Sequence, residues 1–210
     1  MEAYEIPLVI FTVLTQWAVG IVIAIALFEW FKPKFLQSVG KHAFKKSVYL
    51  ALGLSIGGTI ASLFHLGNPF KSYMSLIGTF HSWLSREIIA VIAFNIFLIV
   101  LFYVWWKMSD KEGLRKWLGS LTALVGIVLV LISGMVYYQM ALHPEWNHWT
   151  TFGNFLLTGL LLGFLTVSYF VLKGIDEEDT ELVFPFMGRY LAVLIVGLLV
   201  TIAGSLISPG

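Results

Sequence analysis

Six long apolar runs, separated by shorter polar segments, dominate the pattern of hydrophobic and polar positions along the chain. They cover residues 7–30, 48–66, 88–106, 118–140, 152–172 and about 184–207. Each is close to the roughly 20 residues that an α-helix needs to cross the roughly 30 Å hydrocarbon core of a bilayer. The pattern predicts an all-α protein, an integral membrane bundle of six transmembrane helices, with residues 1–210 forming a single transmembrane domain.

Composition supports this class and excludes several others. The chain is 59% hydrophobic and only 12% charged, against roughly 25% charged residues in ordinary soluble domains. This composition predicts membrane lipid as the surroundings, and the net charge of +1 suggests neither a nucleic acid nor an acidic substrate as a partner. The sequence contains no cysteine, which excludes cysteine-ligated iron–sulfur clusters, thiolate catalysis and disulfides within this chain.

The distribution of basic residues predicts the orientation in the membrane. Of the 13 Lys and Arg residues, all except Lys71 and Arg86 fall in the connections after the first, third and fifth apolar runs or at the start of the run that follows. Connections rich in Lys and Arg stay in the cytoplasm. We therefore expect a multi-pass protein of the cytoplasmic membrane whose N- and C-termini, together with residues 64–88 and 141–151, lie on the non-cytoplasmic side.

The connection over residues 64–88 has a composition typical of a functional segment. It places His65, His81, Arg86 and Glu87 at membrane-boundary positions, with Trp83 among them. Ionisable residues at such positions are rare in membrane proteins and commonly mark a site. The chemistry of this chain is therefore expected on its non-cytoplasmic face.

Glu87 has two interpretations. In the first, Ser85 caps the third helix, Glu87 stabilises its first turn through the helix dipole, and Arg86 is a counter-ion or a lipid headgroup anchor. In the second, Glu87 is a proton acceptor. Oxidation of a quinol releases two electrons and two protons, and a partly desolvated carboxylate suits a general base.

His65 also has two interpretations. Gly67 and Pro69 follow it, and they are typical of a helix that ends at this point. A histidine at a helix C-terminus is favoured by the helix dipole. Its imidazole can equally hydrogen-bond a quinone oxygen and change protonation near neutral pH.

Metal sites are not favoured by the sequence. A b-type haem in a membrane bundle needs two histidines on facing helices, inside the bundle, and no histidine lies in the interior of a predicted helix. Zinc binding by His143, Glu145 and His148 has the right ligand types but lacks an evident fourth ligand. We expect no metal in this chain.

The polar residues inside the apolar runs are few. They are Gln16, Asn95, Asn154 and Thr158, and we expect each to make hydrogen bonds between helices. No charged residue lies in the middle of an apolar run, which argues against an ion pump or a coupled transporter.

Two motifs resemble a known family. Residues 60–69 read Ile-Ala-Ser-Leu-Phe-His-Leu-Gly-Asn-Pro and residues 82–88 read Ser-Trp-Leu-Ser-Arg-Glu-Ile. This pair is similar to the DmsC-type membrane anchor subunit of the dimethyl sulfoxide reductase family, and residues 7–16 and 136–159 resemble the same family. The similarity covers roughly residues 6 to 172.

The resemblance implies a haem-free anchor subunit that passes electrons from menaquinol to an iron–sulfur subunit and a molybdopterin catalytic subunit. It implies that His65 and Glu87 bind the quinol. We further expect Trp83, Ser85 and Arg86 to shape the pocket, and we expect docking of the iron–sulfur subunit at Lys71, His143 and Trp146.

Several alternatives stay open. Members of this family usually have another pair of helices after the sixth, and related complexes act on polysulfide, tetrathionate, nitrogen oxides or arsenate, some in the opposite direction. Neither the terminal acceptor nor the direction of electron flow follows from the sequence. From other classes, a small-solute transporter or channel and a b-type cytochrome are the competing hypotheses.

Overall fold

A computed structural model of the protein describes residues 5–31, 41–65, 82–140, 146–174 and 177–207. The regular structure in these ranges is helical, and the helices are α1 (Glu5–Phe31), α3 (Lys41–His65), α5 (Trp83–Lys107), α6 (Glu112–Tyr138), α7 (Thr150–Leu172) and α8 (Glu177–Ile207). All 6 are long and apolar enough to cross a membrane. The all-α class and the six membrane-spanning helices expected from the sequence are confirmed for the described part of the chain.

The helices are longer than the apolar runs that predicted them. α3 begins at Lys41, α5 at Trp83 and α6 at Glu112, each earlier than the hydropathy pattern indicates. Backbone hydrogen bonding does not require apolar side chains, so a helix that crosses the membrane continues into the polar region beyond it. The acidic segment near residue 178 forms the first turn of α8.

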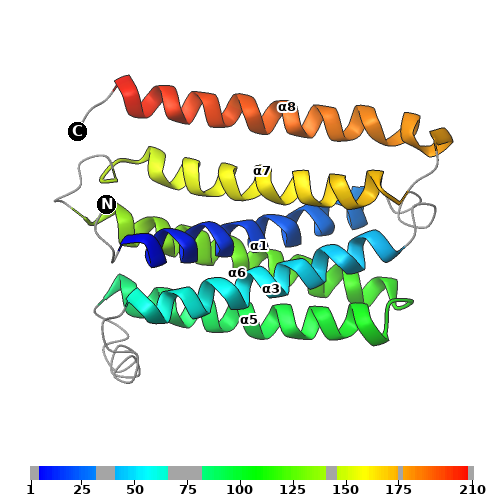
Figure 1. Ribbon diagram of the computed structural model, residues 1–210, viewed down its shortest axis with the longest axis horizontal. Coiled ribbons are helices and arrows are strands. Elements are labelled where there is room, and N and C mark those ends of the chain that lie inside the picture. The colour runs from blue at the N-terminus through cyan, green and yellow to red at the C-terminus, as the bar shows by residue number, and fades with distance from the viewer. Residues whose placement is uncertain (1–4, 32–40, 66–81, 141–145, 175–176, 208–210) are drawn as a thin grey trace.

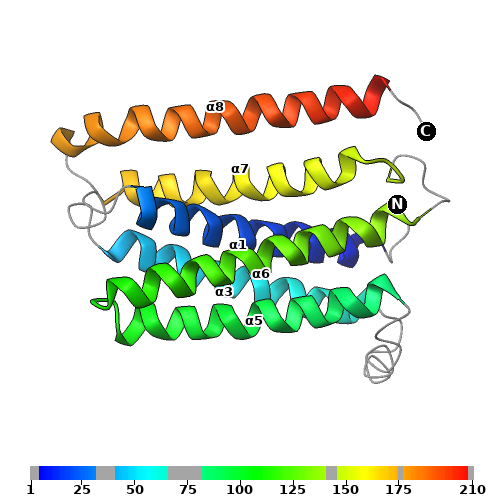
Figure 2. The same ribbon diagram turned by 180° about the vertical axis from the view of Figure 1, so that it is seen from behind.

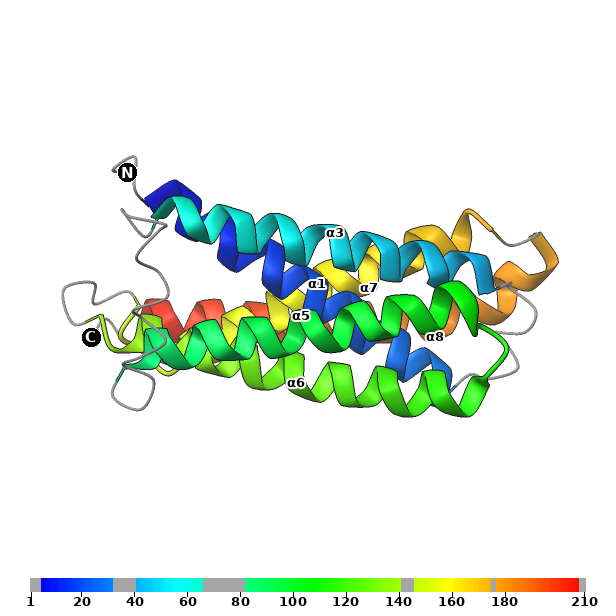
Figure 3. The ribbon, with the colours of Figure 1, turned by 90° about the horizontal axis from the view of Figure 1, so that it is seen from below.

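α1 is the centre of the bundle. It packs against α3, α6 and α7, and Figures 1 and 2 show these helices around it. In Figure 3, which views the bundle from below, α1 crosses behind α3 and α5 at an angle. The most apolar window of α1 is 67% buried inside the protein, whereas that of α8, at the edge beside α7, is 17% buried. α1 is therefore the core helix, and most of α8 faces lipid.

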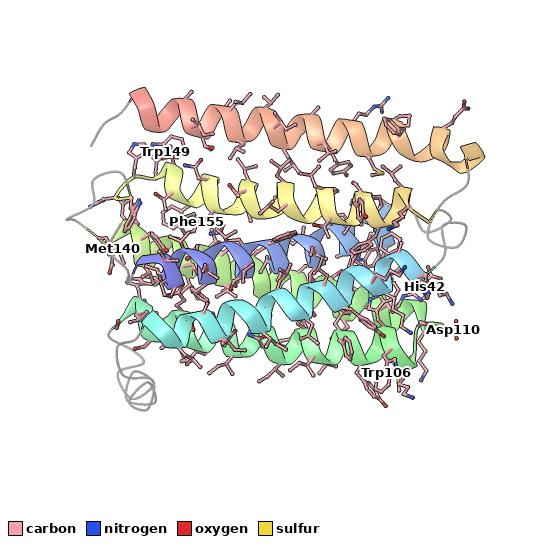
Figure 4. All side chains as sticks on the ribbon, viewed as in Figure 1. His42, Trp106, Asp110, Met140, Trp149 and Phe155 are labelled. Carbon is pink, nitrogen blue, oxygen red and sulfur yellow. The ribbon has the colours of Figure 1, made fainter. Side chains whose placement is uncertain are left out.

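Each end of the bundle contains a buried glutamate, Glu29 at one end and Glu87 at the other. We call the end where α3 and α6 finish and α5 and α7 begin the Glu87 end, and the opposite end the Glu29 end. Figure 4 shows Met140, Trp149 and Phe155 toward the Glu87 end, and His42, Trp106 and Asp110 at the Glu29 end.

Glycines bring α1 and α7 into backbone contact. A Cβ atom on Gly20 would collide with the carbonyl oxygen of Gly159, and one on Gly163 would collide with the backbone of Gly20. A Cβ on Gly159 would lie 2.7 Å from the carbonyl oxygen of Gln16. Small residues allow such close approach of helices in membranes, so these three glycines fix where α1 crosses α7.

A buried ion pair joins α1 to α6 at the Glu29 end. Arg115 Nε lies 2.8 Å from Glu29 Oε1, and the two side chains are 4% and 1% exposed. The guanidinium also donates to the carbonyl oxygen of Ser109 and lies 4.7 Å from the ring centroid of the fully buried Trp105. The sequence placed Arg115 in a polar connection, whereas the structure buries it within α6. The pair closes this end of the bundle.

The glycine contact generates a stability prediction. We expect Gly20→Ala to lower the free energy of unfolding by about 1–3 kcal/mol or more, because the added methyl group meets backbone that cannot rotate away. Gly53→Ala is the matched control, since its Cβ would meet nothing within 4 Å and alanine favours the helix. Unfolding by a denaturing detergent in mixed micelles measures both; equal stability of the two variants would contradict the proposed contact.

The buried ion pair generates a second prediction. Arg115→Met leaves the Glu29 carboxylate without its partner and should destabilise the protein by about 3–5 kcal/mol. Adding Glu29→Gln should restore part of this loss, because no unpaired buried charge remains. Arg189→Met, at an exposed position of α8, is the control for the loss of an arginine. The same unfolding assay applies, and a double variant less stable than Arg115→Met would contradict the pairing.

Candidate functional site

Glu87 is buried within the bundle. α5 starts after Ser82, which occupies the N-cap position in an extended conformation, so Glu87 lies in the second turn of the helix. Its side chain is 4% exposed, and Ser85 is equally buried. The expectation that Ser85 caps the helix is wrong, because Ser85 lies inside it. The interpretation of Glu87 as a first-turn carboxylate stabilised by the helix dipole is wrong because the helix starts earlier, at Trp83.

The partners of Glu87 are sparse. The side chain of Ser133 on α6 hydrogen-bonds the carboxylate, whereas Oε1 is buried without a hydrogen-bond partner among the described residues. The ion pairs within that part of the protein join Lys41 to Asp110, Arg115 to Glu29 and Lys116 to Glu112. Arg86 is therefore not the counter-ion of Glu87; its guanidinium lies 4.3 Å from the ring centroid of Trp83.

The remaining residues predicted for the site are described only in part. His65 is the last residue of α3, at the same end of the bundle as the start of α5 (Figure 1), so the two helix ends lie at one face as expected. The side chain of His65, and all of Lys71, His81 and His143, lie outside the described residues. Trp146, expected to dock the iron–sulfur subunit, lines a cavity.

This cavity has a volume of about 330 Å³ and lies between α1, α6 and α7. Its walls come from segments far apart in the sequence. They are Val9, Thr12, Val13 and Gln16 of α1, Tyr137 of α6, Trp146 before α7, and Thr151, Asn154, Phe155 and Thr158 of α7. The labelled Phe155 in Figure 4 marks its position toward the Glu87 end.

Tyr137 contacts the other two aromatic side chains of the cavity wall. Its ring meets those of Trp146 and Phe155 edge to face, at centroid distances of 5.2 and 5.0 Å. Its hydroxyl lies 2.8 Å from Thr12 Oγ1, and Thr12 donates its own hydrogen to the carbonyl oxygen of Leu8. Tyr137 is therefore the donor to Thr12, which leaves the lone pairs of the Tyr137 oxygen free to accept a hydrogen bond.

Two amide side chains in the cavity wall have unmatched atoms. Gln16 is 5% exposed, and its Nε2 and the Asn154 Oδ1 are buried with no hydrogen-bond partner among the described residues. The expectation of hydrogen bonds between helices is confirmed for Asn95, which bonds Ser55 and Thr59 of α3. It is wrong for Gln16 Nε2 and Asn154 Oδ1. Both residues are recognisable in the sequence as polar positions inside apolar runs, but nothing in the sequence indicates that they share a cavity.

Glu87 and the cavity are connected through α6. Ser133 and Tyr137 are four residues apart and so share one face of that helix. Ser133 contacts Glu87, and the charge of Glu87 is close enough to act on the Tyr137 phenol. Through Ser133 and Tyr137, the carboxylate on α5 and the cavity beside α1 thus both contact this face of α6.

The zinc ligands considered from the sequence do not form a described site. His148 Nδ1 lies 2.8 Å from Thr150 Oγ1 at the start of α7, while His143 and Glu145 lie outside the described residues. Within the described ranges, no group of three His, Cys, Asp or Glu side chains is placed to hold a metal ion.

The fold and the site define a multi-pass membrane protein with a buried carboxylate and a cavity of ligand size at one end. The chain matches the family described as DMSO reductase anchor subunit (DmsC) over residues 1–208, and it belongs to that family. The resemblance seen in the sequence motifs is confirmed.

The relatives of this protein are subunits of oxidoreductases. It is 35% identical over 183 residues to an anaerobic dimethyl sulfoxide reductase subunit of Haemophilus influenzae, and the match covers 85% of this chain and 62% of the relative. It is 33% identical to the corresponding subunit from Escherichia coli, over 82% of this chain and 60% of the relative. A sulfite dehydrogenase subunit of Allochromatium vinosum is 28% identical, over 64% of this chain and 45% of the relative.

The chain thus spans about three fifths of the length of the dimethyl sulfoxide reductase subunits named here. No solved structure matches it.

Proposed function

We propose that this chain is the membrane anchor of a respiratory oxidoreductase complex, and that it exchanges electrons between a quinol, of the menaquinol type, and a redox centre of a partner subunit. Family membership supports the anchor role, since the relatives are named as parts of reductases and of a sulfite dehydrogenase. The observation that carries the quinol site is the burial of Glu87 without a cationic partner among the described ion pairs.

A buried carboxylate without a counter-ion is costly. Transfer of an ionised carboxylate out of water is unfavourable unless it is paired, and ionisable groups within membrane helices are by default functional. Glu87 has one serine partner and one unmatched oxygen among the described residues. This environment suits a group that accepts a proton during turnover, because no ion pair among the described residues holds the carboxylate in its charged form.

Oxidation of one quinol breaks its two O–H bonds and gives one quinone, two electrons and two protons. Glu87 accepts one proton, and His65, as the family resemblance implies, accepts the other before release to water. The electrons pass to an iron–sulfur cluster, which must lie on a partner because the sequence has no cysteine to ligate one. From there they reach a molybdopterin subunit, and in the reverse direction the same groups donate the protons.

The other predicted residues have supporting roles in this proposal. Trp83 and Arg86 are stacked at the start of α5, where they hold the helix end that carries Ser85 and Glu87. Lys71, His143 and Trp146 are retained as docking residues for the iron–sulfur subunit. The cofactor of this chain is the quinol alone, with no haem.

Replacement of Glu87 tests the proposal. Glu87→Gln keeps the shape of the side chain and removes the base, and loss of a general base typically costs about 10²–10⁴-fold in rate. We expect quinol oxidation by the assembled complex to fall by such a factor, while reduction of the acceptor with an artificial donor that bypasses the membrane subunit is unchanged.

Glu112→Gln is the matched control, because this carboxylate pairs with Lys116 at the Glu29 end and is 43% exposed. It should leave quinol oxidation at the level of the unaltered complex. Normal quinol oxidation by an assembled Glu87→Gln complex would show that Glu87 is not the proton acceptor.

We further propose that the Glu87 end faces away from the cytoplasm. The distribution of Lys and Arg supports this orientation, because connections at the Glu29 end carry most of them and such connections stay in the cytoplasm. Protons released from a quinol at the Glu87 end would then leave on the non-cytoplasmic side of the cytoplasmic membrane.

Orientation can be measured directly, because the sequence has no native cysteine. Asn147→Cys lies at an exposed position of the Glu87 end, and Gly113→Cys at an uncrowded position of the Glu29 end. A membrane-impermeant maleimide added to spheroplasts should label Asn147→Cys at once and Gly113→Cys only after lysis. The reverse order of labelling would invert the proposed topology.

A further inference from the structure

We propose that the cavity between α1, α6 and α7 receives the ring of the quinol, with Gln16 and Asn154 hydrogen-bonding its oxygens. This inference rests on the proposed function and adds to it a location. The sequence motifs lie at the ends of α3 and α5, whereas the space for a ring lies beside Tyr137, against α1 and α7.

The size and walls of the cavity suit an aromatic ring. Its volume of about 330 Å³ lies in the range of roughly 300–1,000 Å³ that small-molecule sites have. Tyr137, Trp146 and Phe155 supply ring faces and edges on one side, and Val9 and Val13 supply an aliphatic surface on the other. A flat, largely apolar ligand gains contacts on both sides.

The unmatched polar atoms select the chemistry of that ligand. Gln16 Nε2 is a donor and Asn154 Oδ1 is an acceptor, and both are buried in the wall without a partner among the described residues. A hydroxyl group accepts from the first and donates to the second. A quinol carries two hydroxyls on an apolar ring, whereas the acyl tail of a lipid satisfies neither amide.

The cavity is also open toward the outer surface of α1, which gives the tail of a quinol a way out. Val9 and Val13 are 46% and 40% exposed on the surface of α1, within a membrane-spanning segment. This side of the cavity therefore opens on the surface of a helix that is long and apolar enough to cross a membrane. An isoprenoid tail can remain in lipid there while the ring is held inside.

Tyr137 connects the cavity to Glu87, the proposed proton acceptor. Tyr137 lies in the cavity wall and donates its hydrogen to Thr12, so its oxygen can accept a hydrogen bond from a quinol hydroxyl. One turn earlier on the same face of α6, Ser133 contacts Glu87. A ring in the cavity would thus lie against the face of α6 that also contacts the proposed proton acceptor.

Photolabelling of the complete complex tests the location. An azido-naphthoquinone with a short prenyl tail is irradiated with the complex in native membranes, with and without excess menaquinol, and labelled peptides are identified by mass spectrometry. We expect menaquinol-sensitive label on the peptides of α1 and α7 that contain Gln16 and Asn154. Label confined to α3 and α5 would overturn the cavity site and leave the proposed function standing. Absence of menaquinol-sensitive label would overturn both.

Near-isosteric substitutions test the two amides. Gln16→Met and Asn154→Leu remove one hydrogen bond each, and we expect each to raise KM for a menaquinol analogue roughly three- to tenfold, with kcat changed less than by Glu87→Gln. Gln139→Met and Asn95→Leu carry the same substitutions outside the cavity and should leave KM unchanged. If KM is unchanged in both cavity variants of the assembled complex, Gln16 and Asn154 do not bind the ring.

Discussion

The backbone contact between α1 and α7 is the constraint on which the rest of the structure depends. Gly20 and Gly163 let the two helices cross without side chains between them, and Gly159 lies against the carbonyl oxygen of Gln16. The crossing therefore sets the position of Gln16 relative to Asn154 and Thr158, which lie on α7 within two turns of Gly159. The cavity lies next to this crossing, with all three of these polar side chains in its wall.

The two ends of the bundle show opposite solutions for buried charge. At the Glu29 end, Arg115 neutralises the carboxylate, Ser109 binds the guanidinium and Trp105 covers it. At the Glu87 end, the carboxylate has a serine and no ion pair among the described residues, and two amides close by are incompletely bonded there. One oxygen of each carboxylate, Glu29 Oε2 and Glu87 Oε1, is unmatched within the described residues, so the cation is what distinguishes the two ends. A group held by a fixed opposite charge is poorly suited to exchange protons. The first arrangement stabilises the bundle, and the second keeps its groups available for a ligand.

Hydropathy was sufficient to predict the number and type of the membrane-spanning helices, because a run of about 20 apolar residues matches the length of an α-helix that crosses the hydrocarbon core of a bilayer. The motif around Glu87 was likewise recognisable. Helix starts were not, since α3 begins in the polar sequence at Lys41, and burial of Arg115 depends on Glu29, far away in the sequence. Gln16 and Asn154 could be found as polar residues in apolar runs. That they line one cavity follows only from the crossing of α1 with α7.

The separation of Gln16 and Asn154 along the sequence has a consequence for biogenesis. Membrane helices enter the bilayer in order during translation, so α1 is inserted well before α7 exists. Until α7 arrives, Gln16 lies on a helix whose glycine surface has no neighbour, and the cavity has one wall missing. The proposed ring site is thus completed only when α7 docks against α1. Any nascent polypeptide that pauses before residue 150 would be anchored in the membrane and yet be unable to hold the proposed ligand.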